Sequence, residues 1–90
     1  MEIDFTKTAL SDLNKLKKSG VPIVQQKLKR ILEELKHDPY VGIGNPEPLK
    51  YKYYGYWSRE LTKKDCIIYR IDEQNKIITV YQLLGHYFDK

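Results

Sequence analysis

The spacing of the apolar residues changes once along this chain, at a segment rich in glycine and proline. Before that segment, apolar side chains recur every three or four residues, as they do on one face of a helix. From residue 53 onward, aromatic and β-branched residues dominate and short polar segments separate them, which is typical of strands. Helices followed by a run of strands predict an α+β domain rather than alternating α/β units.

The first half of the chain predicts one strand, over residues 2–5, and two helices, over residues 7–18 and 22–37. Thr6 is a suitable N-cap for the first helix, and Gly20 supplies a stop at its end. Because the connection between the two helices is short, we expect them to pack as an antiparallel hairpin.

The second half predicts three strands, over residues 53–61, 66–72 and 77–84. Their connections are short and polar, so neighbouring strands should pair antiparallel as a meander. With the N-terminal strand, this gives a four-stranded antiparallel sheet with the helical hairpin on one face. The other face is then free to meet a ligand. We expect one domain over residues 1–90.

Composition narrows the kinds of protein that this chain can be. Its 90 residues are 41% apolar and 31% charged, which indicates a folded domain. No apolar run is long enough to cross a bilayer, no secretion signal is recognisable, and Cys66 cannot form an internal disulfide alone. We therefore expect a cytoplasmic protein that does not engage membranes. The net charge of +4 permits a polyanionic partner such as RNA without identifying it.

Three motifs carry most of the chemistry that the sequence offers. Glu47 stands between two prolines, which stiffen the backbone and suit a carboxylate presented in a fixed direction from a loop. The motifs are Gly42-Ile43-Gly44-Asn45-Pro46-Glu47-Pro48-Leu49-Lys50, Gly55-Tyr56-Trp57-Ser58-Arg59 and Gly85-His86-Tyr87. Together they supply acids, bases and cations within a small domain.

These motifs resemble those of the YoeB branch of the RelE/ParE toxins, and the resemblance spans nearly the whole chain. It implies a helical hairpin on an antiparallel sheet, in agreement with the elements predicted above. It further implies a toxin paired with a YefM-like antitoxin, which acts on the ribosome as an endoribonuclease, cuts messenger RNA and uses no metal. A homodimer is also plausible on this resemblance.

Cleavage of RNA without metal requires a base for the ribose 2′-hydroxyl, an acid for the leaving 5′-oxygen and positive charge around the transition state. The resemblance implies that Glu47 is the base and His86 the acid. We hypothesise that bound RNA removes water from Glu47. Arg59 matches a family arginine that grips the scissile phosphate, and the alternative for it is a surface ion pair with Glu60 or Asp65.

Several further side chains are candidates for holding RNA. Tyr87, also counted among the catalytic residues, either orients a phosphate, stacks on a base or fills the core. Lys50, Lys52 and Tyr54 belong to a segment in which tyrosines and cations interleave, a mixture suited to single-stranded RNA. Since Tyr56 and Trp57 point to opposite faces of a strand, one of the two must lie in the core.

The chain departs from the family pattern at two cations. Cys66 aligns with a catalytic arginine of close relatives, and Glu60 replaces a second arginine. One missing charge of this kind typically costs roughly 3–4 kcal/mol of transition-state stabilisation, so we expect a slow or rewired enzyme. Strand alternation puts Arg70 on the face of Cys66, which makes Arg70 one candidate replacement and an RNA-binding residue; Lys64 is the other.

No cofactor or metal is expected, because no Cys, His or carboxylate cluster has the spacing of a zinc or calcium site. Cys66 has no neighbour that would activate a thiol, so we interpret it as a packing residue. His37, at a helix end, is interpreted as a surface residue. The alternative function is a binding module that holds an antitoxin or another target without cutting RNA.

Overall fold

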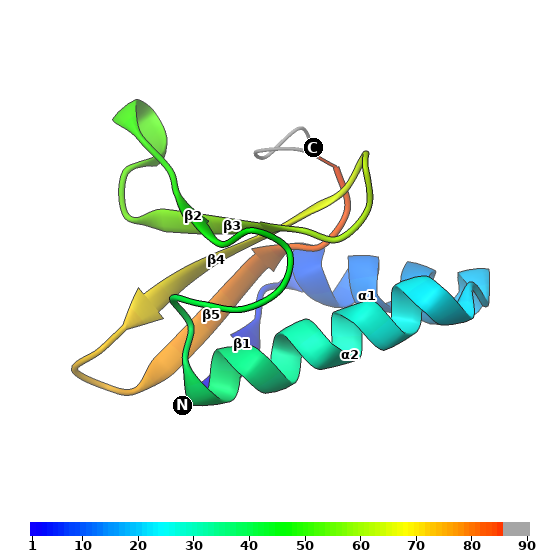
Figure 1. Cartoon of the computed structure of the whole chain (residues 1–90), viewed down its shortest axis with the longest axis horizontal. Coiled ribbons are helices and arrows are strands. Elements are labelled where there is room, and N and C mark those ends of the chain that lie inside the picture. Colours follow the sequence, from blue (N-terminus) through cyan, green and yellow to red (C-terminus); the bar gives the residue numbers. More distant parts are fainter. Residues whose placement is uncertain (86–90) are drawn as a thin grey trace.

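Two helices lie side by side across one face of a five-stranded sheet in the computed structural model, which describes residues 1–85 (Figure 1). His86 and Tyr87 therefore lie outside the described residues. The elements are β1 (Glu2–Phe5), α1 (Lys7–Ser19), α2 (Pro22–His37), β2 (Glu47–Pro48), a 3-10 turn η1 (Tyr51–Tyr53), β3 (Tyr56–Glu60), β4 (Cys66–Asp72) and β5 (Ile77–Gln82).

The helix boundaries follow from local signals, as predicted. The Thr6 hydroxyl accepts a hydrogen bond from the Ala9 N–H at 3.2 Å, so Thr6 is the N-cap of α1. Gly20 ends α1 in the left-handed conformation, with φ 67°, where a side chain would be strained. Pro22 occupies the first turn of α2, where its missing N–H costs nothing.

The sheet order is β1-β5-β4-β3-β2, which differs from the prediction in two respects. First, β1 pairs with β5 in parallel, whereas the other pairs are antiparallel. No tight turn joins β1 to β5, so nothing local dictates an antiparallel pairing. Second, the two-residue β2 adds a fifth strand at the edge. Pro48 is tolerated there because an edge strand needs fewer ladder hydrogen bonds.

The bounds of two strands also differ from the prediction, and β3 ends at Glu60 rather than at residue 61. β3 begins at Tyr56 rather than at residue 53, because residues Tyr51–Tyr53 form a 3-10 turn instead. β5 ends at Gln82 rather than at Leu84. The N–H groups of Leu83 and Leu84 donate to the Asp12 carboxylate, so they do not continue a strand ladder.

The core lies between the helices and the sheet. Fully buried Ile31 and Leu35 of α2 belong to one cluster with Tyr69 of β4 and Val80 of β5. Burying one such aliphatic side chain contributes about 1.5–3 kcal/mol, so this layer supplies much of the stability. Trp57 packs against the same cluster, and it is thus the core member of the Tyr56–Trp57 pair. Within residues 1–85, no helix combines the length and apolarity needed to traverse a membrane.

Candidate active site

Glu47 belongs to a row of side chains that crosses the sheet on the face opposite the helices. In the strand registers, Glu47 is the partner of Ser58, Ser58 of Ile68, and Ile68 of Gln82. Cross-strand partners point to the same face, and the adjacent row, which contains Trp57, packs toward the helices. Ser58, Ile68 and Gln82 are buried, whereas Glu47, at the edge of the sheet, is exposed. Its carboxylate therefore meets solvent on the open face, which is the face of the sheet opposite the helices.

The backbone on either side of Glu47 is tied to β3. The Glu60 N–H donates to the Gly44 carbonyl at 2.7 Å, and the Leu49 N–H donates to the Tyr56 carbonyl at 2.8 Å. These bonds and β2 restrain the backbone on either side of Glu47, while a fixed direction of its carboxylate stays a prediction.

A patch of one cation and two aromatic rings lies beside this row. The Arg70 guanidinium lies 5.0 Å from the Tyr56 ring centroid, and the Tyr56 and Tyr81 rings meet edge to face at 5.2 Å. Tyr56 is the register partner of Arg70, and Ser58 is that of Ile68. The row that contains Arg70 and Tyr56 therefore lies about 7 Å from the row that contains Ser58 and Glu47, because the two rows are two residues apart along each strand. Arg70 is exposed and on the same face as Cys66 and Ile68, as strand alternation predicts.

The predicted RNA-binding residues of the β2–β3 connection project from the edge of the sheet, where the connection stands away from the helices (Figure 1). Lys50 and Lys52 are exposed, and Lys52 lies 5.2 Å from the Tyr53 ring. Tyr54 is 83% exposed and Tyr51 is 92% exposed, so these rings are accessible to a partner. The connection is continuous with β2 and hence with Glu47.

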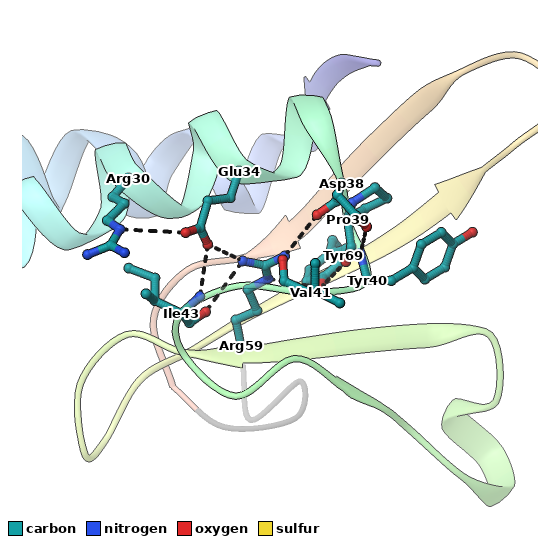
Figure 2. A network of polar contacts seen from close by, with 9 residues as sticks. All are labelled: Arg30, Glu34, Asp38, Pro39, Tyr40, Val41, Ile43, Arg59 and Tyr69. Atoms are coloured by element: carbon teal, nitrogen blue, oxygen red, sulfur yellow. Dashed lines mark hydrogen bonds and ion pairs between the residues drawn. The ribbon is translucent and has the colours of Figure 1, made fainter.

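The predicted role of Arg59 as a phosphate ligand is wrong. Its side chain is fully buried, on the helix-facing side of β3, and its guanidinium forms an ion pair with Glu34 of α2 at 2.7 Å (Figure 2). The alternative, a surface pair with Glu60 or Asp65, is wrong too. The physical reason is strand alternation: Ser58 faces the open side with Glu47, so the next residue must face the core.

Cys66 is buried at the start of β4, which agrees with its interpretation as a packing residue. Its N–H donates to the Gly85 carbonyl at 2.8 Å, and this bond places residue 85 beside β4. The Gly85 N–H donates in turn to Asp65 at 2.9 Å. The chain is therefore held in place up to the residue that directly precedes the predicted acid, His86.

The sequence prediction missed Asp12, whose buried carboxylate accepts hydrogen bonds from Leu83 and Leu84 at 3.0 and 3.1 Å. Its position was a usable signal: Asp12 lies within the apolar stripe of an amphipathic helix, and an aspartate that is buried there needs hydrogen-bond donors. In the described part of the chain, residues 1–85, no group of three or more His, Cys, Asp or Glu side chains is placed to hold a metal ion.

Comparison with known proteins agrees with this fold. The YoeB/ParE toxin from Agrobacterium tumefaciens superposes with a TM-score of 0.85 at 29% identity, over 97% of this chain and 100% of that chain. A YoeB–YefM complex from Staphylococcus aureus gives a TM-score of 0.78 at 26% identity, over 97% and 98%. The fold is thus that of the small toxins of this structural class.

The sequence comparison identifies the family. Toxin YoeB of Synechocystis is 30% identical over 78 residues, which are 87% of this chain and 90% of the relative. The sequence model described as "YoeB-like toxin of bacterial type II toxin-antitoxin system" matches residues 5–87. The chain belongs to this family of YoeB-like toxins.

Proposed function

We propose that this toxin is an endoribonuclease that acts on the ribosome and cuts messenger RNA by metal-free acid/base catalysis. The observation that carries the proposal is the register of Glu47 with Ser58. It presents an exposed carboxylate on the open face of the sheet, beside the Arg70 patch and on the face away from the helices.

The proposed reaction needs one proton removed and one supplied. Glu47 takes the proton of the ribose 2′-hydroxyl, whose oxygen attacks the adjacent phosphorus. The bond from phosphorus to the 5′-oxygen breaks, and His86 protonates that oxygen. The products are a 2′,3′-cyclic phosphate and a free 5′-hydroxyl, and no water or metal is consumed in this step.

The placement of residue 85 supports a shared site for the base and the acid. Gly85 lies beside Cys66 of β4, and β3 separates β4 from β2, which carries Glu47. Three spacings between adjacent chains of about 4.8 Å, together with an offset of two residues along β3, about 7 Å, amount to roughly 16 Å between the backbones of Gly85 and Glu47. The proposal requires one phosphodiester to fit between the Glu47 carboxylate and the His86 imidazole.

Positive charge around the transition state is proposed to come from Arg70. Arg59 is buried and paired, and on the resemblance Cys66 stands where close relatives have an arginine, so neither residue supplies positive charge to the open face. Arg70 is exposed on that face, one row from Glu47 and Ser58. Lys64 in the β3–β4 turn is also exposed and is the second candidate. Lys50, Lys52 and Tyr54 are proposed to hold flanking nucleotides.

The proposed partners follow from the family. Staphylococcus aureus YoeB is found in a complex with YefM and as a dimer. We accordingly propose that this chain binds a YefM-like antitoxin and forms a homodimer. We also propose that it acts in the cytoplasm, where the ribosome and messenger RNA are located. The net charge of +4 favours both an acidic antitoxin segment and RNA by long-range attraction.

A second candidate function is a binding module that holds its target without cutting it. The burial of Arg59, together with a cysteine at position 66 where the resemblance implies an arginine, favours this alternative, because a transition state deprived of one charge loses about a hundredfold to a thousandfold in rate. The two candidates differ in one measurable respect: only the nuclease requires Glu47 and His86.

A translation reaction programmed with a defined messenger separates the candidates, with broken ends mapped for the wild type, Glu47→Gln and His86→Gln. Glu33→Gln, an exposed change on α2, is the matched control. The nuclease predicts cleavage by the wild type and the control, and at least a hundredfold loss in the other two. Equal cleavage by all four proteins would overturn the proposal, and an inactive wild type that binds antitoxin would favour the binding module.

A further inference from the structure

The Arg59 guanidinium is surrounded by acceptors from the loop that leads to Glu47 (Figure 2). Nη2 donates to the Val41 carbonyl at 2.8 Å and to that of Asp38 at 3.4 Å. Nη1 donates to the Glu34 carboxylate at 2.7 Å and to the Ile43 carbonyl at 3.4 Å. With the bond from Nε to the Tyr69 hydroxyl, each of the guanidinium's five N–H groups has an acceptor.

Glu34 binds the same loop from the side of the helix. Its Oε1, which pairs with Arg59, also accepts the Ile43 N–H at 2.9 Å, and its Oε2 lies 3.5 Å from Arg30 Nε. The Tyr69 hydroxyl donates to the Pro39 carbonyl at 3.0 Å. The Arg59–Glu34 ion pair and one tyrosine therefore bond five backbone groups of an irregular loop: the carbonyls of Asp38, Pro39, Val41 and Ile43 and the N–H of Ile43.

Glycine at position 42 is what allows the loop to close on this pair. Gly42 has φ 136°, and a Cβ there would lie 2.1 Å from Glu34 Oε1 and 2.7 Å from Arg59 Nη1. Gly44 has φ 83°, and its Cβ would lie 2.7 Å from the Glu60 carbonyl oxygen. The spacing of the two glycines in the first motif is thus explained by contact with buried groups.

The loop is connected to Glu47 within a few residues. The Gly44 carbonyl accepts the Glu60 N–H, and Glu47 then pairs with Ser58, the immediate neighbour of Arg59. β2 is only two residues long, and one of them is a proline, so its own ladder is a weak restraint. The position of Glu47 therefore depends on the segment that enters β2.

We infer that Arg59 and Glu34 are positioning residues for Glu47: the ion pair of the buried Arg59 with the partly buried Glu34 fixes loop 38–45 and thereby sets where the Glu47 carboxylate meets its substrate. This inference rests on the proposed function, in which Glu47 is the base. It assigns Arg59 a role on the opposite face of β3 from the RNA, where it contacts neither the phosphate nor the reacting atoms.

Removal of Arg59 is a poor test, because it leaves Glu34 with Arg30 as its remaining ion-pair partner and takes the donor away from three loop carbonyls, so the protein would lose stability. Gly42→Ala instead pushes the pair and the loop apart while both charges remain. Gly20→Ala is the matched control: Gly20 also has a positive φ, of 67°, but a Cβ there meets nothing within 4 Å. Glu34→Gln is a second variant, which keeps the shape and removes the charge.

Two kinds of measurement on the folded protein are needed. The first is the NMR signal of the Glu47 amide and side-chain carboxyl, together with hydrogen exchange of the Ile43 amide, which donates to Glu34. The second is messenger cleavage in the translation reaction as a function of pH. A displacement of about 1 Å at a catalytic group can cost on the order of a hundredfold in rate.

The inference predicts that Gly42→Ala and Glu34→Gln shift the Glu47 signals, speed exchange at Ile43, lower cleavage at least tenfold and move the acidic limb of the pH profile. Gly20→Ala should do none of these. Glu47 signals and cleavage unchanged in both variants would overturn the inference. If Glu47 moves in both variants but the wild type cuts no RNA, the positioning of Glu47 by the pair is supported and the proposed nuclease is refuted.

Discussion

The carboxylate of Asp12, in α1, accepts a hydrogen bond from the N–H of Leu83 at 3.0 Å across a separation of 71 residues. The same oxygen accepts the Leu84 N–H at 3.1 Å. A helix side chain thus ends β5 and directs the chain toward the segment that contains His86. Asp65 takes the next N–H, that of Gly85, so two carboxylates hold the three residues before the predicted acid.

Asp12→Asn should therefore reduce both stability and activity. Loss of the charge weakens two hydrogen bonds to a buried carboxylate, each worth about 1.5–3 kcal/mol when a charged partner is involved. Urea unfolding measures the first effect, and messenger cleavage per folded molecule measures the second. Asn14→Ala, on an exposed position of the same helix, is the control. Unchanged stability in Asp12→Asn would contradict the role of this carboxylate.

Arg70→Ala should lower cleavage by about a hundredfold to a thousandfold if Arg70 stabilises the transition state in place of the missing family arginine. Arg70→Lys keeps the charge and should retain part of the activity. Lys15→Ala removes a cation from an exposed position on α1 and should have no effect. Cleavage by Arg70→Ala at the wild-type rate would remove Arg70 from the mechanism and direct attention to Lys64.

The double variant Lys50→Ala/Lys52→Ala should weaken binding rather than chemistry. Both lysines are exposed in the projecting β2–β3 connection, so their contribution is expected to be counterion release on contact with phosphates. For single-stranded RNA, the slope of log K against log salt should fall by about 1.4 in magnitude when two contacts are lost. Fluorescence anisotropy at several salt concentrations measures the slope. An unchanged slope would place these lysines away from the RNA.

Stability should decline at high pH through Tyr69. Burial raises the pKa of the Tyr69 hydroxyl, and the hydrogen bond and charge of Arg59 oppose the rise without cancelling it. The unfolded tyrosine loses its proton near its ordinary pKa of about 10, while the folded one keeps it. The contribution of protonated Tyr69 to the free energy of unfolding is therefore complete below pH about 10, and it is lost as the pH rises through the pKa of Tyr69 in the folded protein.

Urea unfolding between pH 8 and pH 11 tests whether stability falls at high pH through Tyr69. Above pH about 10, the free energy of unfolding of the wild type should fall more steeply than that of Tyr69→Phe, which cannot titrate there. Tyr51→Phe is the control, because Tyr51 is 92% exposed. Parallel declines in the wild type and Tyr69→Phe would contradict the assignment.

The sequence predicts the helices well because their signals are local. Thr6, Gly20 and Pro22 each act within one turn of the helix end that they define. The parallel pairing of β1 with β5 depends on segments at opposite ends of the chain, and no nearby residue encodes it. β2 was missed because a two-residue strand that contains a proline has no recognisable period.

The candidate site was predicted only in part, because some of its features follow from local sequence signals and others do not. The face of Arg70 follows from strand alternation, and the structure agrees with it, whereas the role of the proline-flanked Glu47 stays a prediction. The prediction for Arg59 failed because the family match outweighed strand alternation. If Trp57 faces the core, then Arg59 must face it as well, and a buried arginine needs a partner such as Glu34.

The chemistry of the broken RNA ends tests the central claim most directly. Purified toxin, ribosomes and a defined messenger should yield an upstream fragment with a 2′,3′-cyclic phosphate and a downstream fragment with a 5′-hydroxyl. A messenger with a single 2′-deoxynucleotide on the 5′ side of the cut should resist cleavage there, because Glu47 would have no hydroxyl to activate. A 5′-phosphate on the downstream fragment, or cleavage at the deoxy position, would contradict the account.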